Sequence, residues 1–288
     1  MPDNPTSYVS AQSFTPGRAY WNQRMALAGC RERMAALSRA VDRASDLSMF
    51  QFAQLVASTL EFGPDLILEL GRKKGNSLCA FTEAANQLST PCRVLSLCDT
   101  RDWRKITVPA LRQIVPASWF KPAEAIQCDI LKFDYASALA GAKRVLIFWD
   151  AHGFEIAEWV LGRILPRIAG LQHLVFMHDM SDARYTPPPD DYAGREMWKG
   201  FSAGEARLRI GIVDSAVAQS ISIQDFAGRN HLTLDSAEHS IDLEINQVPG
   251  RTAEMRELLG DELFSLQGHW FWFTLNQHPG PYTFPRVA

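Results

Sequence analysis

Acidic side chains follow a series of short apolar segments in this chain of 288 residues. They are Glu69 in LILEL, Asp99 after RVLSLC, Asp150 after RVLIFW, Asp179 after HLVFMH, and Asp129 after the weaker segment AIQC. In sheets of parallel strands, ligands bind outside the carboxyl ends of the strands. Carboxylates gathered there offer several acceptor sites to the hydroxyl groups of a ligand. The pattern therefore predicts a binding site at one edge of a sheet.

Two histidines stand beside these acids, in Asp150-Ala151-His152 and in His178-Asp179. A neutral imidazole can accept a proton near physiological pH, so His152 or His178 is a candidate general base, with the acids orienting it. The remaining histidines lack such neighbours and are expected to be packed or exposed: His173, His231, His239, His269 and His278.

The segment LELGRKKGNS places two glycines four residues apart, at Gly71 and Gly75. This spacing differs from the dinucleotide fingerprint G-x-G-x-x-G, and from the P-loop, which has a lysine where this chain has Asn76. The sequence also has no G-x-S-x-G nucleophile elbow. What remains is a strand, a tight glycine turn and a helix. The basic residues 72–74 are expected to be solvated on this turn; contact with an anionic acceptor is the alternative.

Strand-like and helix-like segments alternate along the chain, which predicts a parallel sheet with right-handed crossovers. The expected strands are 66–70, 93–99, 125–130, 144–150, 173–179 and 269–276, and the expected helices are two between Tyr20 and Ala57, then 76–88, 154–169 and 215–229. Residues 1–60 are predicted to form an arm and helices, and residues 61–288 one α/β domain. The Pro-, Asp- and Tyr-rich stretch at about 180–210 is too long for an ordinary connection and is predicted to be a lid.

Composition excludes some classes of protein. The 29 basic and 32 acidic residues give a net charge of −3 without long basic runs, which argues against binding to nucleic acid or to a membrane surface. The five cysteines lack metal-site spacing and are expected to be reduced. The polar N-terminus does not look like a signal peptide, and no apolar run is long enough to span a membrane. A soluble, cytoplasmic protein is predicted.

The ordered series of motifs resembles the class I S-adenosylmethionine-dependent methyltransferases. It is closest to the branch with the catechol-type and sugar O-methyltransferases and the cephalosporin-hydroxylase-like proteins. The motifs are LELGRKKGNS, RVLSLCDT, CDILKFD, FWDAHGFE and VFMHDM, within about residues 62–180. The resemblance implies a Rossmann-like, mostly parallel sheet of seven strands, with helices on both faces and a reversed final hairpin that HWFWFTL would complete.

The resemblance also implies how S-adenosylmethionine would be bound. Gly71 and Gly75 would let the backbone approach it, Glu69 and Ser77 would lie near its methionine end, and Asp99 would accept hydrogen bonds from its ribose. Asp129 and Ile130 would lie beside the adenine. The implied cofactor-binding set is Glu69, Gly71, Gly75, Asn76, Ser77, Asp99, Asp129 and Ile130.

The implied activity is O-methylation of a small-molecule or sugar hydroxyl, with a small-molecule acceptor as the partner and homo-oligomers possible. In the metal-dependent relatives, acids in the positions of Asp150 and Asp179 bind Mg²⁺, and His178 would make Mn²⁺ or Fe²⁺ better suited. The metal set is therefore Asp150, His178 and Asp179, and the catalytic set is His152, Asp150 and His178. The alternatives are a metal-free histidine base, a cephalosporin-hydroxylase-like metal enzyme and a non-catalytic binding protein of the same fold.

Overall fold

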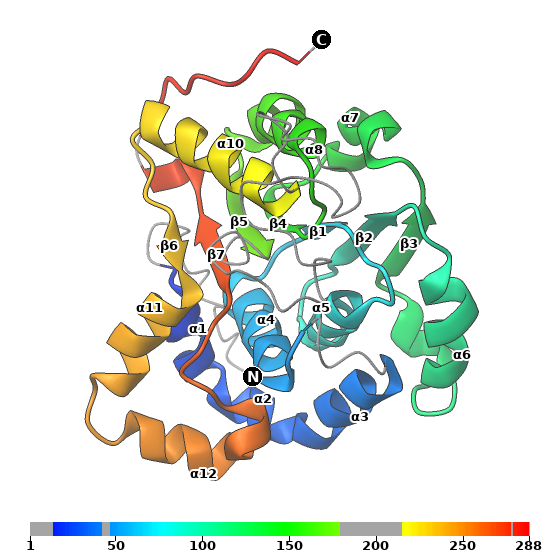
Figure 1. The fold of residues 1–288 in the computed structure, drawn as a ribbon. Helices are drawn as coiled ribbons and strands as arrows, with labels where there is room; N and C mark the ends of the chain where they lie inside the picture. The colour runs from blue at the N-terminus through cyan, green and yellow to red at the C-terminus, as the bar shows by residue number, and fades with distance from the viewer. Residues whose placement is uncertain (1–13, 42–46, 179–214, 278, 288) are drawn as a thin grey trace, which may run out of the picture.

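The chain forms a seven-stranded sheet with helices on both faces (Figure 1). The computed structural model describes residues 14–41, 47–178, 215–277 and 279–287. The strand order is β3-β2-β1-β4-β5-β7-β6; β1 to β5 pair in parallel, and β7 runs antiparallel to its neighbours. The bounds are β1 Leu66–Leu70, β2 Arg93–Cys98, β3 Ala123–Gln127, β4 Arg144–Trp149, β5 Gln172–His178, β6 Asp235–Ser236 and β7 Trp270–Phe273. This confirms the predicted fold, reversed final hairpin included.

In the described part of the chain, four helices precede the sheet, where the sequence predicted two. They are α1 Pro16–Asn22, α2 Arg24–Gly29, α3 Arg31–Val41 and α4 Met49–Phe62. Capping residues define both ends of helix α4. Ser48 and Gln51 form a capping box at its start, and Gly63, in the left-handed region at φ 61°, ends it.

The helices after β1 connect the strands and cover the sheet. Helix α5 Asn76–Gln87 follows the glycine turn as predicted, and α10 Ser215–Arg229 also has the predicted bounds. The apolar run at 154–169 is one helical segment in three parts, because a π-helical turn at Val160–Ile164 separates two α-helical pieces. The remaining helices are α6 Val108–Leu111, α7 Tyr135–Leu139, α8 Phe154–Trp159, α9 Leu165–Ile168, α11 Ala237–Ile241 and α12 Arg251–Leu263.

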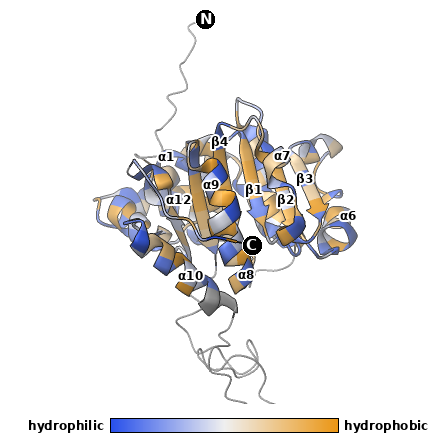
Figure 2. Ribbon diagram, turned by 90° about the horizontal axis from the view of Figure 1, so that it is seen from above, coloured by the Kyte–Doolittle hydropathy of each residue, from blue (hydrophilic) through white to orange (hydrophobic). Residues whose placement is uncertain are grey.

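Strands β1, β4 and β5, in the middle of the sheet, are buried on both faces, so the core has two layers. On one face, Ile67, Phe148 and Phe176 pack with α4 and α5, and the N-terminal helices share this layer. On the other face, Leu68 and Trp149 pack with the helices between Phe154 and Ile168 and with α10. Figure 2 shows mainly hydrophobic strands in the middle of the molecule, with helices of mixed hydropathy around them. The N-terminal helices are therefore built into the main core.

Several predictions differ from the structure in detail. Strand β3 begins two residues and ends three residues earlier than expected, and it stops at Gln127 because Asp129 already caps a 3₁₀ turn at Ile130–Lys132 through the backbone N–H of Leu131. The predicted lid lies largely within 179–214, outside the described residues. All five cysteines are free thiols in the structure. Within the described ranges, no helix is long and apolar enough to cross a membrane.

Candidate functional site

Three of the predicted side chains meet at the carboxyl edge of the sheet. Asp150 directly follows β4, and His178 is the last residue of the neighbouring β5. Nδ1 of His178 lies 3.3 Å from Oδ1 of Asp150, and Nε2 of His152 lies 4.0 Å from the same oxygen. The exposed fractions of these side chains are 8% for His178, 20% for Asp150 and 25% for His152. The acid thus lies between a buried imidazole and a more accessible one.

A fourth residue in this cluster was missed by sequence reasoning. The side-chain nitrogen of Gln51, at the start of α4, lies 3.3 Å from Nε2 of His178. Gln51 is separated from His178 by 127 positions, so no motif links the two. The only signal was local: Ser48-x-x-Gln51 is the pattern of a capping box, which predicts a helix start but not its neighbour.

The predicted metal site does not fit the arrangement around His178. A metal ligand must offer a free lone pair on a ring nitrogen. Both ring nitrogens of His178 already face protein groups, the carboxylate of Asp150 and the amide of Gln51. Among the described residues, no three histidines, cysteines or acids are grouped so as to hold a metal ion, and Asp179 lies outside those residues.

Glu69 lies inside strand β1 and not at its open end, contrary to the sequence interpretation. Its carboxylate is fully buried and accepts hydrogen bonds from the hydroxyls of Ser77 and Ser96. Burial raises the pKa of Glu69 to about 7, although the two serine hydroxyls and Arg72 act in the opposite direction. Glu69 and Ser77 therefore form an internal pair beneath the glycine turn, and their contact with a cofactor stays a prediction.

The basic triplet is only partly at the surface, which corrects the expectation of solvated side chains. Arg72 is 4% exposed, and its guanidinium donates to the backbone and hydroxyl oxygens of Ser96 at 2.5 and 3.0 Å. Lys73 is exposed and has a positive φ of 45°. Arg72 thus brings a positive charge under the turn, where its field favours the ionised form of Glu69.

The glycine turn is packed tightly against the chain itself. A Cβ atom on Gly71 would lie 2.5 Å from the backbone oxygen of Asp150, and one on Gly75 would lie 2.4 Å from the ring of Trp103. Both glycines also have positive φ, 92° and 89°. Internal packing therefore explains why glycine stands at these positions, and it holds the turn against the start of the Asp150 segment.

The other predicted cofactor residues lie around this turn. Asn76 begins α5 and is 3% exposed; its amide nitrogen donates to the backbone oxygen of Leu47, and its buried Oδ1 has no hydrogen-bond partner among the residues that the structure describes. Asp99 follows β2 directly and is exposed. Asp129 is also exposed, and its ion pair with Lys132, at 3.1 Å, contributes to lowering its pKa. Ile130, beside it, is half-buried.

His173, expected to be packed or solvated, is a buried structural histidine. Its Nδ1 lies 2.9 Å from the backbone oxygen of Leu171, and its Nε2 accepts the backbone N–H of Leu275 at 2.9 Å. Burial lowers the pKa of His173 to about 4. It therefore ties β5 to the segment after β7 and takes no part in the cluster at the sheet edge.

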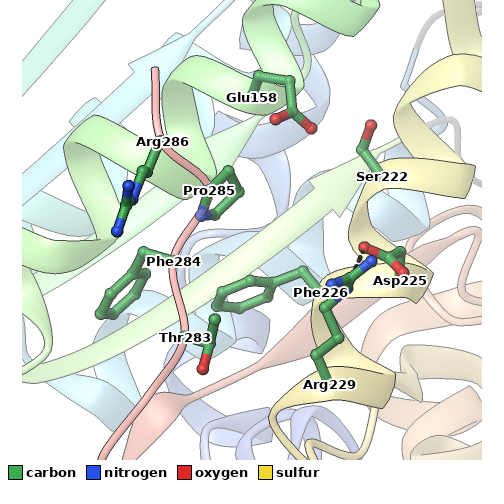
Figure 3. Close-up of a pocket in the computed structure, with 9 residues that line it drawn as sticks. All are labelled: Glu158, Ser222, Asp225, Phe226, Arg229, Thr283, Phe284, Pro285 and Arg286. Carbon is green, nitrogen blue, oxygen red and sulfur yellow. Dashed lines mark hydrogen bonds and ion pairs between the residues drawn. The ribbon is translucent and has the colours of Figure 1, made fainter. Parts of the chain in front are cut away.

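A separate pocket of about 310 Å³ lies in the helical layer of α8 and α10, where the C-terminal residues 283–286 cross it (Figure 3). Stacked rings of Phe226 and Phe284 line it, and Asp225 is paired with Arg229 at 2.7 Å. Phe226 belongs to the core layer on the opposite face of the sheet from α4. The pocket is thus distinct from the Asp150 cluster.

Neither a family model nor a curated protein matches the sequence. Three solved structures illustrate the similarity of shape. Cofactor-bound Rv0187 from MTB is 16% identical, with 85% of this chain and 89% of that one covered and a TM-score of 0.46. A putative O-methyltransferase from Klebsiella pneumoniae is 16% identical, with coverages of 70% and 82% and a TM-score of 0.45. The O-methyltransferase TomG from Streptomyces achromogenes, in complex with SAM, is 18% identical, with 70% and 81% covered and a TM-score of 0.44. At these values, the similarities say nothing about the activity of this chain.

Proposed function

We propose that the protein is an S-adenosylmethionine-dependent methyltransferase that acts on a hydroxyl group of a small molecule. The observation that carries the proposal is the Asp150 carboxylate between His178 and His152, at the edge where the glycine turn also ends. The strand order supports it, because it brings the turn after β1 and the acid after β2 to this same edge. The motif series in the sequence points to the same chemistry.

The residues around the turn suit the proposed cofactor. S-adenosylmethionine supplies an electrophilic methyl group, and it carries an ammonium group and a ribose diol that need acceptors. The buried Oδ1 of Asn76, which has no hydrogen-bond partner within the described part of the chain, suits the ammonium group. The exposed carboxylate of Asp99 suits the diol, since it offers several acceptor sites. Arg72 does not oppose the positively charged cofactor from the surface, because its guanidinium is held inside by Ser96.

Within the cluster, His152 is the residue we assign as general base. Its side chain is the most accessible of the three, whereas both ring nitrogens of His178 face protein groups. The Asp150 carboxylate lies 4.0 Å from Nε2 of His152, so its negative charge favours the protonated ring that results when His152 takes the proton of the acceptor hydroxyl. Asp150 would then stabilise the charged imidazolium that forms.

A second candidate, a non-catalytic protein of this fold, has one observation in its favour. The ring of Trp103 covers Gly75, and Arg72 fills the space beneath the turn, so the chain uses its own side chains where close approach of a ligand was expected. A protein of this kind would retain the fold without transferring methyl groups.

Methyl transfer from radiolabelled S-adenosylmethionine to a panel of catechols, flavonoids and sugars tests the proposal, with and without EDTA. We expect transfer that survives EDTA and falls at least about 100-fold in His152→Gln, the scale of general-base catalysis. His239→Gln is the matched control, because His239 lies in α11, away from the cluster. Activity lost with EDTA, or unchanged in His152→Gln, would contradict the roles proposed for these residues. Binding without turnover on any acceptor would favour the non-catalytic candidate.

A further inference from the structure

The orientation of the Gln51 amide is fixed by its neighbours. The side-chain oxygen of Gln51 accepts the backbone N–H of Ser48 at 2.9 Å and the Ser48 hydroxyl at 2.7 Å. Oxygen and nitrogen of an amide are otherwise assigned from their partners, and here one partner is unambiguous, because a backbone N–H can only donate. The oxygen must face Ser48, so the –NH₂ group of Gln51 faces His178.

This orientation determines which ring nitrogen of His178 carries the proton. The –NH₂ group of Gln51 can only donate, and it lies 3.3 Å from Nε2 of His178. Nε2 must therefore be the unprotonated, accepting nitrogen, and the proton of the neutral ring is on Nδ1. Nδ1 lies 3.3 Å from Oδ1 of Asp150, a group that only accepts when ionised. The Gln51 donor thus requires this tautomer, and the charge of the nearby Asp150 carboxylate favours it.

We propose that Gln51 is a positioning residue that locks His178 as the Nδ1–H tautomer, so that His178 orients Asp150 and does not bind a metal ion. Its link to catalysis rests on the proposed function; the tautomer itself does not. In this arrangement the lone pair of Nε2 faces the Gln51 donor, and Nδ1 lies 3.3 Å from the Asp150 carboxylate, whose charge favours a proton on that nitrogen. No nitrogen of His178 remains to coordinate a cation.

Burial explains why such a contact can hold the ring. Gln51 and His178 are 4% and 6% exposed, so water does not compete effectively for either side chain, and a mismatched donor would remain unsatisfied. His178 also packs beside the ring of Phe148, with centroids 6.1 Å apart. The N-terminal helices therefore reach the sheet edge through the first turn of α4 and determine the orientation of the group that faces Asp150.

The direct test is the ¹⁵N NMR spectrum of the protein labelled at its seven histidines, with the His178 signals assigned from His178→Gln. For the wild type, we expect a protonated, pyrrole-type signal for Nδ1 and an unprotonated, pyridine-type signal for Nε2. A protonated Nε2 in the wild type at neutral pH would overturn the proposal without any variant. Because the spectrum needs no substrate, this result stands whether or not methyl transfer is found.

Two substitutions sharpen the test. In Gln51→Glu, the second carboxylate oxygen replaces the donor with an acceptor, so we expect Nε2 of His178 to become protonated. In Gln51→Met, which fills similar space without a donor, we expect the Nε2 signal to move towards an average of both tautomers and kcat to fall about tenfold, with a smaller change in KM. An Nε2 signal that is the same in wild type and Gln51→Glu would overturn the proposal.

The control is Gln54→Met, one turn along the same helix. Gln54 is also buried, and it bonds to the backbone oxygen of Gln267 and the indole of Trp270 instead of His178. The Gln54→Met variant should lose stability, as Gln51→Met does, but its His178 signals should stay at their wild-type positions. In a final arm, Zn²⁺ added to the wild type should leave the His178 signals unchanged; a shift of Nε2 would show metal coordination and refute the proposal.

Discussion

Replacing Glu69 by glutamine should remove a pH-dependent loss of stability that the buried carboxyl group imposes. Burial raises the pKa of Glu69 to about 7 in the folded protein, against an ordinary value of 4.5. The folded state therefore holds a proton that the unfolded state releases between these values. The contribution of Glu69 to the stability of the folded state is fully present below pH 4.5 and is lost as the pH rises through about 7.

The magnitude follows from the shift. Each pKa unit corresponds to about 1.36 kcal/mol, so a shift from 4.5 to about 7 amounts to roughly 3 kcal/mol over the whole range, and to about 2.5 kcal/mol between pH 5 and pH 8. The group is fully buried, so solvent screening does not reduce this value. Glutamine does not titrate, and all other groups cancel when the variant is compared with the wild type. Between pH 5 and pH 8, the free energy of unfolding of Glu69→Gln should therefore rise by about 2.5 kcal/mol relative to that of the wild type.

Urea unfolding followed by tryptophan fluorescence at pH 5, 6, 7 and 8 measures this difference. His173 supplies the comparison of opposite sign: burial lowers its pKa to about 4, so its contribution is present above pH 6.5 and is lost as the pH falls towards 4. Relative to that of the wild type, the free energy of unfolding of His173→Gln should therefore fall as the pH rises from 4 to 6.5. If the free energies of unfolding of wild type and Glu69→Gln change in parallel with pH, the reasoning that burial outweighs the serine and arginine contacts of Glu69 is refuted.

Three further predictions concern the sheet edge. In urea unfolding, Gly71→Ala should destabilise the protein by at least about 2 kcal/mol more than Gly141→Ala. Both glycines have positive φ, but only Gly71 has a backbone oxygen 2.5 Å from the added Cβ. Equal losses of stability in the two variants would contradict the close packing of Gly71. Ser96→Ala should weaken the folded state by about 1–3 kcal/mol, because Glu69 and Arg72 both lose a buried partner; a loss no larger than in the exposed Ser137→Ala would contradict that network. Trp103→Ala should loosen the turn at Gly75 and speed amide hydrogen exchange of residues 75–79 relative to those of β4, and unchanged exchange there would show that the ring does not support the turn.

The positions of the buried strands along the chain could be predicted because each is a short apolar run between polar or glycine-containing turns. Strand β1 and helices α5 and α10 lie where the sequence placed them, within a residue. Asp99 and Asp150 follow their strands as predicted, since a polar residue after a buried run marks where the strand leaves the core. The two-residue strand β6 gave no signal, because Asp235–Ser236 is too short to show a period.

The side-chain partners at the edge could not be predicted, because they come from distant segments. Glu69 looked like the end of a strand, but Leu70 continues the strand, and the carboxylate is buried beneath the turn with Ser96 of the adjacent strand. The charge of Arg72 suggested exposure, yet its partners are oxygens of β2 and β3. The metal prediction was based on the residue types at 178 and 150, and no motif pointed to Gln51, whose amide nitrogen lies 3.3 Å from Nε2 of His178.

The central claim is that the edge bearing Asp99 and Asp150 binds S-adenosylmethionine, and calorimetric titration with its product S-adenosylhomocysteine tests it most directly. We expect one binding site per chain in the wild type, retained in EDTA, and a loss of about 1.5–3 kcal/mol of binding free energy in Asp99→Asn, as for a hydrogen bond to a charged group. Asp235→Asn, in the two-residue strand β6 at the far end of the sheet, should bind like the wild type. No heat of binding from folded wild-type protein, or equal affinity in Asp99→Asn, would contradict the account.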